Sequence, residues 1–196
     1  MGEVDHLVIL GIALFIICIC KMKYNIDFGF QLGNKKIGIK YLVVFTLIVL
    51  IYVLVNYLIG YYFGINQPIN YPLNIRNVLG TLGFQLFLSG PAEELLFRAI
   101  PISLLIFVFK DNKIIRWGIS IETIIASILF SMTHISWSLN PFLINFELYQ
   151  LVYSFVLGLA YGMVYQKSKS VIYPILMHSS SNLIYIGVGY LFKLLI

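Results

Sequence analysis

The sequence contains few charged residues. Asp, Glu, Lys and Arg together make up 11% of the chain, whereas soluble domains are usually about a quarter charged. Hydrophobic residues make up 60%, and the mean hydropathy is +0.93. Polar low-complexity segments, long linkers and internal repeats are all absent. This composition excludes an ordinary soluble protein and predicts an integral membrane protein whose 196 residues form one compact helical bundle.

The chain also lacks the short motifs of several functional classes. Its two cysteines, Cys18 and Cys20, lie in one apolar run, so they predict neither a stapling disulfide nor a CxxC metal pair. There is no HExxH zinc motif, no GxSxG nucleophile elbow and no Cys near a His, so nothing supports a covalent nucleophile. The net charge of +5 comes from cations in short loops between apolar runs, which indicates membrane topology and no nucleic-acid partner.

Six apolar runs are candidates for membrane spans, each of which needs about 20 residues. The N-terminal MGEVDH has no basic region, so we expect the first run to be a retained helix and not a cleaved signal peptide. The third run is too long for one straight span, and Pro91 and Pro101 supply the kinks it needs. The six runs cover about residues 7–20, 41–63, 78–109, 118–135, 149–165 and 171–192. The predicted fold class is therefore all-α, with about six transmembrane helices.

Lys and Arg are distributed unevenly between the two sets of loops, with ten on one side and two on the other. The positive-inside rule makes the richer side cytoplasmic, so both termini should lie outside. We expect an integral protein of a prokaryotic plasma membrane. Gly158 and Gly162 form a GxxxG pair, which predicts close helix packing within the bundle or, alternatively, at a dimer interface. The oligomeric state is not indicated.

Polar and ionisable residues inside the predicted spans form a candidate intramembrane site, because such residues are costly in a bilayer and are usually functional. Glu94 and Arg98 are four residues apart on one helical face and can pair, whereas Glu93 is rotated by about 100° and can face a cavity. His178 and Asn182 are also four residues apart. The full set is Glu93, Glu94, Arg98, Phe130, His134, His178 and Asn182.

Two explanations fit this set, a structural polar cluster or a catalytic site. A carboxylate can act as a general base on water, while His and Asn can hold that water or stabilise a developing oxyanion. These groups suit peptide-bond hydrolysis. A zinc ion held by His134, His178 and Glu93 is chemically possible, because two His and one Glu form a known catalytic set. The residues alone do not decide between metal-bound and metal-free water.

Three motifs in this set resemble those of the CPBP intramembrane proteases, the family of CAAX prenyl proteases and bacteriocin-processing enzymes that is also called ABI. EELLFR at 93–98 is similar to its EExxxR motif, FSMTH at 130–134 to FxxxH, and HSSSN at 178–182 to HxxxN. The motifs occur in the family's order, and the similarity extends from about Val78 to the C-terminus. One departure is Ala99, where the family often has Gly.

The resemblance implies a role for each residue. Glu93 is the base that activates water, and Asn182 helps to stabilise the oxyanion. Glu94 and Arg98 are a supporting pair, and Phe130 is a further supporting residue. His134 and His178 position the water or the scissile carbonyl. The resemblance favours a mechanism that requires no cofactor, with zinc or another divalent metal as the alternative. It also divides the chain into an N-terminal two-helix membrane region, 1–75, and a catalytic membrane core, 76–196.

The leading functional hypothesis is thus an intramembrane endopeptidase that acts on a membrane-associated, lipidated or leader peptide. One alternative is a non-proteolytic bacteriocin self-immunity or scaffold protein of the same fold. A small transporter or proton relay is a third, although transporters usually show repeated halves and this chain does not. Prenylated CAAX tails, bacteriocin leaders and signal-like peptides all remain possible substrates.

The positions of Lys and Arg raise one difficulty for a shared site. Glu93 lies 17 residues from Lys110, whereas His178 lies only 9 residues from Lys169. At 1.5 Å per residue, straight vertical helices would place the two side chains at different depths. We therefore expect part of 101–116 to lie along the membrane interface. The loop at 136–146 is a candidate border of the substrate entrance.

Overall fold

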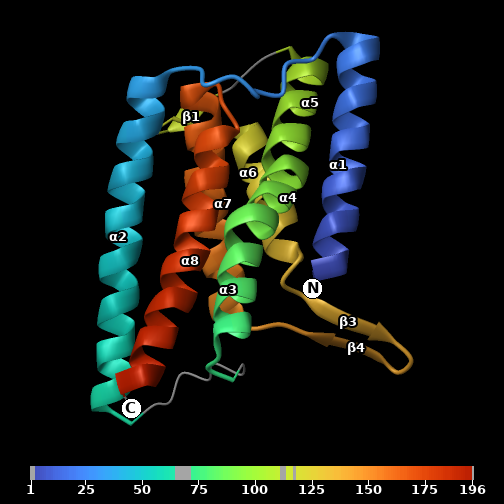
Figure 1. The fold of residues 1–196 in the computed structure, drawn as a ribbon. Helices are drawn as coiled ribbons and strands as arrows, with labels where there is room; N and C mark the ends of the chain where they lie inside the picture. The colour runs from blue at the N-terminus through green and yellow to red at the C-terminus, as the bar shows by residue number, and fades with distance from the viewer. Residues whose placement is uncertain (1–2, 65–71, 111–113, 117, 196) are drawn as a thin grey trace.

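The computed structural model describes residues 3–64, 72–110, 114–116 and 118–195. The chain is mostly helical, and its helices form an elongated bundle with α1 and α2 on opposite flanks (Figure 1). The helices are α1 (Glu3–Tyr24), α2 (Lys35–Tyr62), α3 (Ile75–Phe84), α4 (Gly90–Glu94), α5 (Ile100–Phe109), α6 (Ile121–Met132), α7 (Leu148–Ser168) and α8 (Ile172–Leu195), with the π-helical turns η1 (Gln85–Ser89) and η2 (Leu95–Ala99). Each predicted run corresponds to one helix, except the third, which corresponds to the continuous path from α3 to α5.

The count of six spans is not confirmed. Within the described residues, three helices are long and apolar enough to cross a membrane, namely α1 from Val4, α2 and α7. Helix α6 has 12 residues, because the Ser120 side chain caps its start and a turn follows Met132. Twelve residues rise about 18 Å, which is shorter than the roughly 30 Å hydrocarbon layer.

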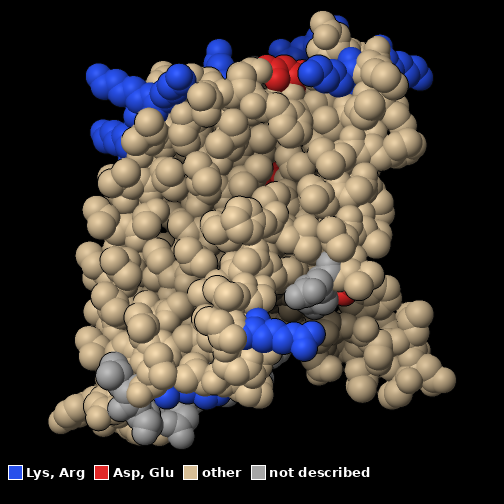
Figure 2. Space-filling model, viewed as in Figure 1, with Lys and Arg blue, Asp and Glu red and all other residues tan. Residues whose placement is uncertain are grey.

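The outer surface has the distribution of charge that the loop cations predicted. Most of the Lys and Arg side chains in view gather at one end of the molecule, a smaller number lie near the opposite end, and the flank between them is almost entirely uncharged (Figure 2). Large apolar side chains on α1 and α2 are exposed, including Phe15, Ile48 and Ile51. Both ends of the chain lie toward the opposite end of the bundle (Figure 1). The division of the chain at residue 75 stays a prediction.

The segment from α3 to α5 is one continuous helical path whose turns change type at two prolines. Proline lacks an N–H group and its ring crowds the carbonyl four residues earlier, so it disturbs a regular helix. The carbonyl that each proline disturbs belongs to Phe87 in η1 for Pro91 and to Phe97 in η2 for Pro101. The wider π turns accommodate both prolines, and they enclose the short helix α4 that carries Glu93 and Glu94.

The expectation that part of 101–116 lies along the interface is wrong for 101–109. Helix α5 continues the direction of α3 and α4 as far as Phe109, beside α1 (Figure 1). The loop over 25–34 instead crosses the end of the bundle where α7 joins α8 (Figure 1). Asn34 N donates to Ser168 O, and Val171 N donates to Gly29 O. The 25–34 loop thus covers this turn, and Lys169 lines one pocket with Ile106 and Phe107, about one turn before Lys110.

Two short antiparallel hairpins depart from an all-α fold. One pairs β1 (Ile114–Arg116) with β2 (Ile119–Ser120). The other pairs β3 (Ser136–Leu139) with β4 (Phe142–Asn145) and projects sideways from the bundle (Figure 1). The second hairpin occupies the predicted loop at 136–146, and every residue of its two strands is exposed.

The glycines of the predicted GxxxG pair face α6. A Cβ atom at Gly158 would lie 2.9 Å from Ser127 Cβ, and one at Gly162 would lie 2.8 Å from Thr123 Cγ2. Both approaches are shorter than real carbon contacts, so these positions admit only glycine at this helix separation. The pair therefore serves packing within the bundle.

Candidate active site

The adjacent glutamates of α4 point in different directions, as their spacing predicted. Glu94 is completely buried, whereas the Glu93 side chain is 18% exposed and lines a cavity of about 470 Å³. His134, His178 and Asn182 line the same cavity. The structure thus brings together residues from α4, α8 and the turn after α6 that the sequence marked as a candidate site.

Glu94 contacts two partners. Its Oε2 lies 3.2 Å from Arg98 Nε, and its Oε1 lies 2.8 Å from His178 Nδ1. Because a carboxylate only accepts hydrogen bonds, the proton of a neutral His178 ring is on Nδ1 and its Nε2 is unprotonated. That Nε2 lies 3.8 Å from Glu93 Oε2. Glu94 therefore orients His178 toward Glu93, a contact that helical spacing could not predict.

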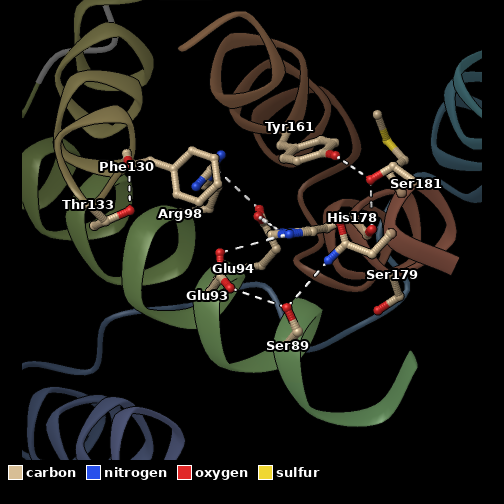
Figure 3. Close-up of polar contacts among 12 residues, drawn as sticks. Ser89, Glu93, Glu94, Arg98, Phe130, Thr133, Tyr161, His178, Ser179 and Ser181 are labelled. Carbon is tan, nitrogen blue, oxygen red and sulfur yellow. Dashed lines mark hydrogen bonds and ion pairs between the residues drawn. The ribbon is translucent and has the colours of Figure 1, made fainter. Parts of the chain in front are cut away.

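Arg98 is fully buried, and aromatic rings surround its guanidinium group. The guanidinium carbon lies 4.1 Å from the centre of the Phe130 ring and 5.4 Å from that of Tyr161 (Figure 3). Ring faces attract cations, and together with the Glu94 carboxylate they compensate a charge that would be costly to bury alone. Phe130 is thus the first residue of the FxxxH motif and also a direct neighbour of Arg98.

The His178 imidazole is fixed by the same aromatic pair. Tyr161 stacks on it, with centroids 5.4 Å apart and planes inclined by 18°, and Phe130 meets it edge-on at 5.9 Å. The Tyr161 hydroxyl lies 3.1 Å from Ser181 Oγ, one turn along α8 (Figure 3). These contacts hold the ring in one orientation.

Glu93 has two further partners that the motif analysis missed. Ser89 Oγ donates to Glu93 Oε1 at 3.2 Å, and His6 Nε2 lies 2.9 Å from the same oxygen. Ser89 is one turn earlier in the same helical path, so helical spacing could have found it. His6 is 87 residues away on α1, and the only signal in the sequence was that it is one of three histidines. All three line this cavity.

Asn182 is connected to Glu93 through Ser89. Its Nδ2 donates to Gln85 Oε1 at 2.8 Å and to Ser89 Oγ at 3.3 Å, and Ser89 in turn donates to Glu93. An amide nitrogen carries two hydrogens, so both N–H groups of Asn182 are engaged in this conformation. The oxyanion role implied by the family resemblance would require one of these two bonds to break.

His134 lies in the turn that follows α6, one turn beyond Phe130. Its ring meets the Phe130 ring edge-on at 5.5 Å, and its Nδ1 lies 3.4 Å from Gln150 Nε2. Because an amide nitrogen donates, Nδ1 is the acceptor, and a neutral ring then carries its proton on Nε2. His134 can therefore offer an N–H group.

Four tyrosines from three helices form part of the remaining cavity wall. Tyr153 stacks on both Tyr52 and Tyr149, with centroids about 6 Å apart, and Tyr185 lies on the same wall. These rings combine apolar faces with hydroxyl groups, which suits an amphipathic peptide.

The candidate metal ligands are not grouped around one point. Within the described parts of the chain, no three His, Cys, Asp or Glu side chains are placed so that they could hold one metal ion. The metal-dependent alternative with His134, His178 and Glu93 remains a hypothesis, and chelation of the active protein would test it.

Comparison with known families connects this geometry to an activity. The family model described as type II CAAX prenyl endopeptidase Rce1-like matches residues 75–184, which is more than half of the chain. The match includes all the residues of the three motifs and leaves α1 and α2 outside. A search of curated proteins and a search of solved structures each returned no match. The sequence resemblance is thus confirmed, and the chain is an integral membrane protein that belongs to the Rce1-like family of type II CAAX prenyl endopeptidases.

Proposed function

We propose that this protein is an intramembrane endopeptidase in which Glu93 activates the water that attacks a peptide bond. The observation that supports this most directly is the 3.8 Å separation between Glu93 Oε2 and His178 Nε2, two atoms of residues that line the cavity. One water molecule can hydrogen-bond to two atoms at that separation.

The reaction needs a base, a donor for the oxyanion and a proton for the leaving amine. Glu93 removes a proton from the water as its oxygen bonds to the scissile carbonyl carbon. The carbonyl oxygen becomes an oxyanion, and when the C–N bond breaks the proton moves from Glu93 to the departing amine. His178 holds the water through Nε2, because its Nδ1–H donates to Glu94.

We assign the oxyanion donor to His134. Its Nε2 carries the proton and can donate it when Nδ1 accepts from Gln150. Asn182 then acts indirectly, because it donates to the Ser89 hydroxyl that bonds Glu93. A single donor to an oxyanion contributes about 100- to 1000-fold in rate, so His134→Ala should lower turnover by that factor.

The family description favours a prenylated CAAX-type peptide as the substrate. The tyrosine-lined wall of the cavity supplies apolar faces for the lipid or for aliphatic side chains. We place the protein in a prokaryotic plasma membrane with both termini outside, because the Lys- and Arg-rich end is expected to face the cytoplasm.

The test is cleavage of a farnesylated, internally quenched CAAX peptide by the purified full-length protein in liposomes. We expect cleavage by the wild type and none by Glu93→Gln. Glu147→Gln is the matched control, because Glu147 is an exposed carboxylate outside the cavity. Full activity of Glu93→Gln would refute the assignment of the base. If the wild type does not cleave this peptide, the proposed substrate class is wrong.

A further inference from the structure

Helix α1 lies outside the part of the chain that matches the family, yet it contributes a buried histidine to the cavity. The family match begins at residue 75, and α1 ends at Tyr24. His6 is 4% exposed, whereas its neighbours Val4 and Leu7 are 72% and 57% exposed. The first turn of α1 thus turns its one imidazole inward while apolar side chains face outward.

The packing of α1 fixes where His6 points. Ala13 and Ile17 are buried in the core, and together with His6 they follow the i, i+7, i+11 spacing of one helical face. This face packs against α4 and the two π turns, the part of the structure that carries Glu93. The imidazole also meets the Phe84 ring edge-on, with centroids 5.0 Å apart.

The two carboxylate oxygens of Glu93 have different partners. His6 Nε2 lies 2.9 Å from Oε1, and because a carboxylate only accepts, the imidazole donates its Nε2–H. Ser89 donates to the same oxygen. The other oxygen, Oε2, is the one that faces His178 Nε2. His6 and Ser89 thus both bond to Oε1, and Oε2 remains directed toward the position proposed for the water.

We infer that His6 is a positioning residue for Glu93 and that α1 is therefore a functional part of the active site. This inference rests on the proposed function, since it assumes that Glu93 is the base. Without the His6 bond, Ser89 is the remaining donor to Oε1, so the carboxylate can rotate more freely about its terminal side-chain torsion and Oε2 is directed less firmly toward the water. The matched region alone would then be an incomplete enzyme.

A positioning role predicts a specific kinetic pattern. Hydrogen bonds to charged groups are strong enough that His6→Ala should lower kcat by about 10- to 100-fold. KM should change by less than about twofold, because His6 bonds to the base Glu93 and not to the substrate. His6→Gln should recover much of the loss, because its amide nitrogen can replace Nε2 as donor. Leu7→Ala, an exposed change on the same turn, is the control and should keep full activity.

A second measurement does not depend on turnover. The chain has three histidines, so ¹⁵N-histidine labelling gives few imidazole signals, and His6→Gln identifies the one from His6. We expect the Nε2–H tautomer with a hydrogen-bonded proton signal that moves when Glu93 is replaced by Gln. An unchanged His6 signal in Glu93→Gln would show that the two groups do not meet.

The outcomes separate this inference from the proposed function. Inactive Glu93→Gln with fully active His6→Ala would overturn the positioning role and leave the base assignment intact. The activity of His6→Ala could instead fall only in proportion to the amount of folded protein, with no recovery in His6→Gln. That result would show that His6 stabilises the packing of α1 and does not position Glu93. Active Glu93→Gln would refute the proposed function itself.

Discussion

Replacing one member of the buried pair Glu94 and Arg98 should destabilise the protein far more than replacing both. Both side chains are 0% exposed, and the Nε to Oε2 distance is 3.2 Å. Removal of one partner leaves the other as a buried charge without its opposite charge, which costs about 3–5 kcal/mol. Arg98→Met and Glu94→Gln are each expected to lower the free energy of unfolding by this amount.

The double variant carries no buried charge at these positions. Gln at position 94 can still accept from His178 Nδ1, and Met at position 98 can pack between the rings of Phe130 and Tyr161. Replacement of a buried ion pair by apolar or neutral residues is often nearly neutral. We expect a loss of about 1 kcal/mol, and hence a coupling energy of several kcal/mol between the two positions.

The assay is SDS titration in mixed micelles of the wild type, the two single variants and the double variant. The free energy of unfolding is taken from each transition. Glu147→Gln should stay within about 0.5 kcal/mol of the wild type, because its carboxylate is exposed. Single losses that add to within about 0.5 kcal/mol in the double variant would refute the reasoning, since independent sites add in that way.

Three further predictions concern other contacts. Ser89→Ala should lower kcat about tenfold. Because Ser89 links Asn182 to Glu93, Asn182→Ala should have little further effect in the Ser89→Ala background. Independent effects of the two substitutions on kcat would contradict this link. Gly162→Val should destabilise the bundle by about 1–3 kcal/mol in the SDS titration, since its Cβ would lie 2.8 Å from Thr123 Cγ2, whereas Gly11→Ala, with no atom within 4 Å, should not. Trp137 is 67% exposed on the uncharged hairpin, so in a Trp117→Phe background its fluorescence should be quenched by brominated lipid; emission insensitive to that lipid would place the hairpin away from the membrane.

Local spacing was enough to predict part of the site. The four-residue interval from Glu94 to Arg98 placed them as a pair, and the 100° rotation separated Glu93 from them. The three motifs placed His134, His178 and Asn182 around one cavity, as the structure has them. These relations depend on helix geometry and on the family pattern, both of which are encoded over a few residues.

The remaining features depend on contacts between distant segments. His6 and Glu93 are 87 residues apart in the sequence. Their contact depends on how α1 packs against α4, which no short sequence motif predicts. The depth argument from Lys169 assumed straight, regular helices, whereas the path from α3 to α5 contains two π turns. The partners of Asn182 were also hidden, since Gln85 has no motif and lies in a π turn, whose position the sequence did not reveal.

The central claim is that the Glu93 carboxylate removes a proton from the attacking water. Its most direct test is the single-turnover rate of farnesylated CAAX peptide cleavage by Glu93→Gln in liposomes, measured with enzyme in excess. General-base catalysis contributes about 100- to 10,000-fold, so the rate should fall at least 100-fold below that of the wild type. A rate within tenfold of the wild type would contradict the mechanism.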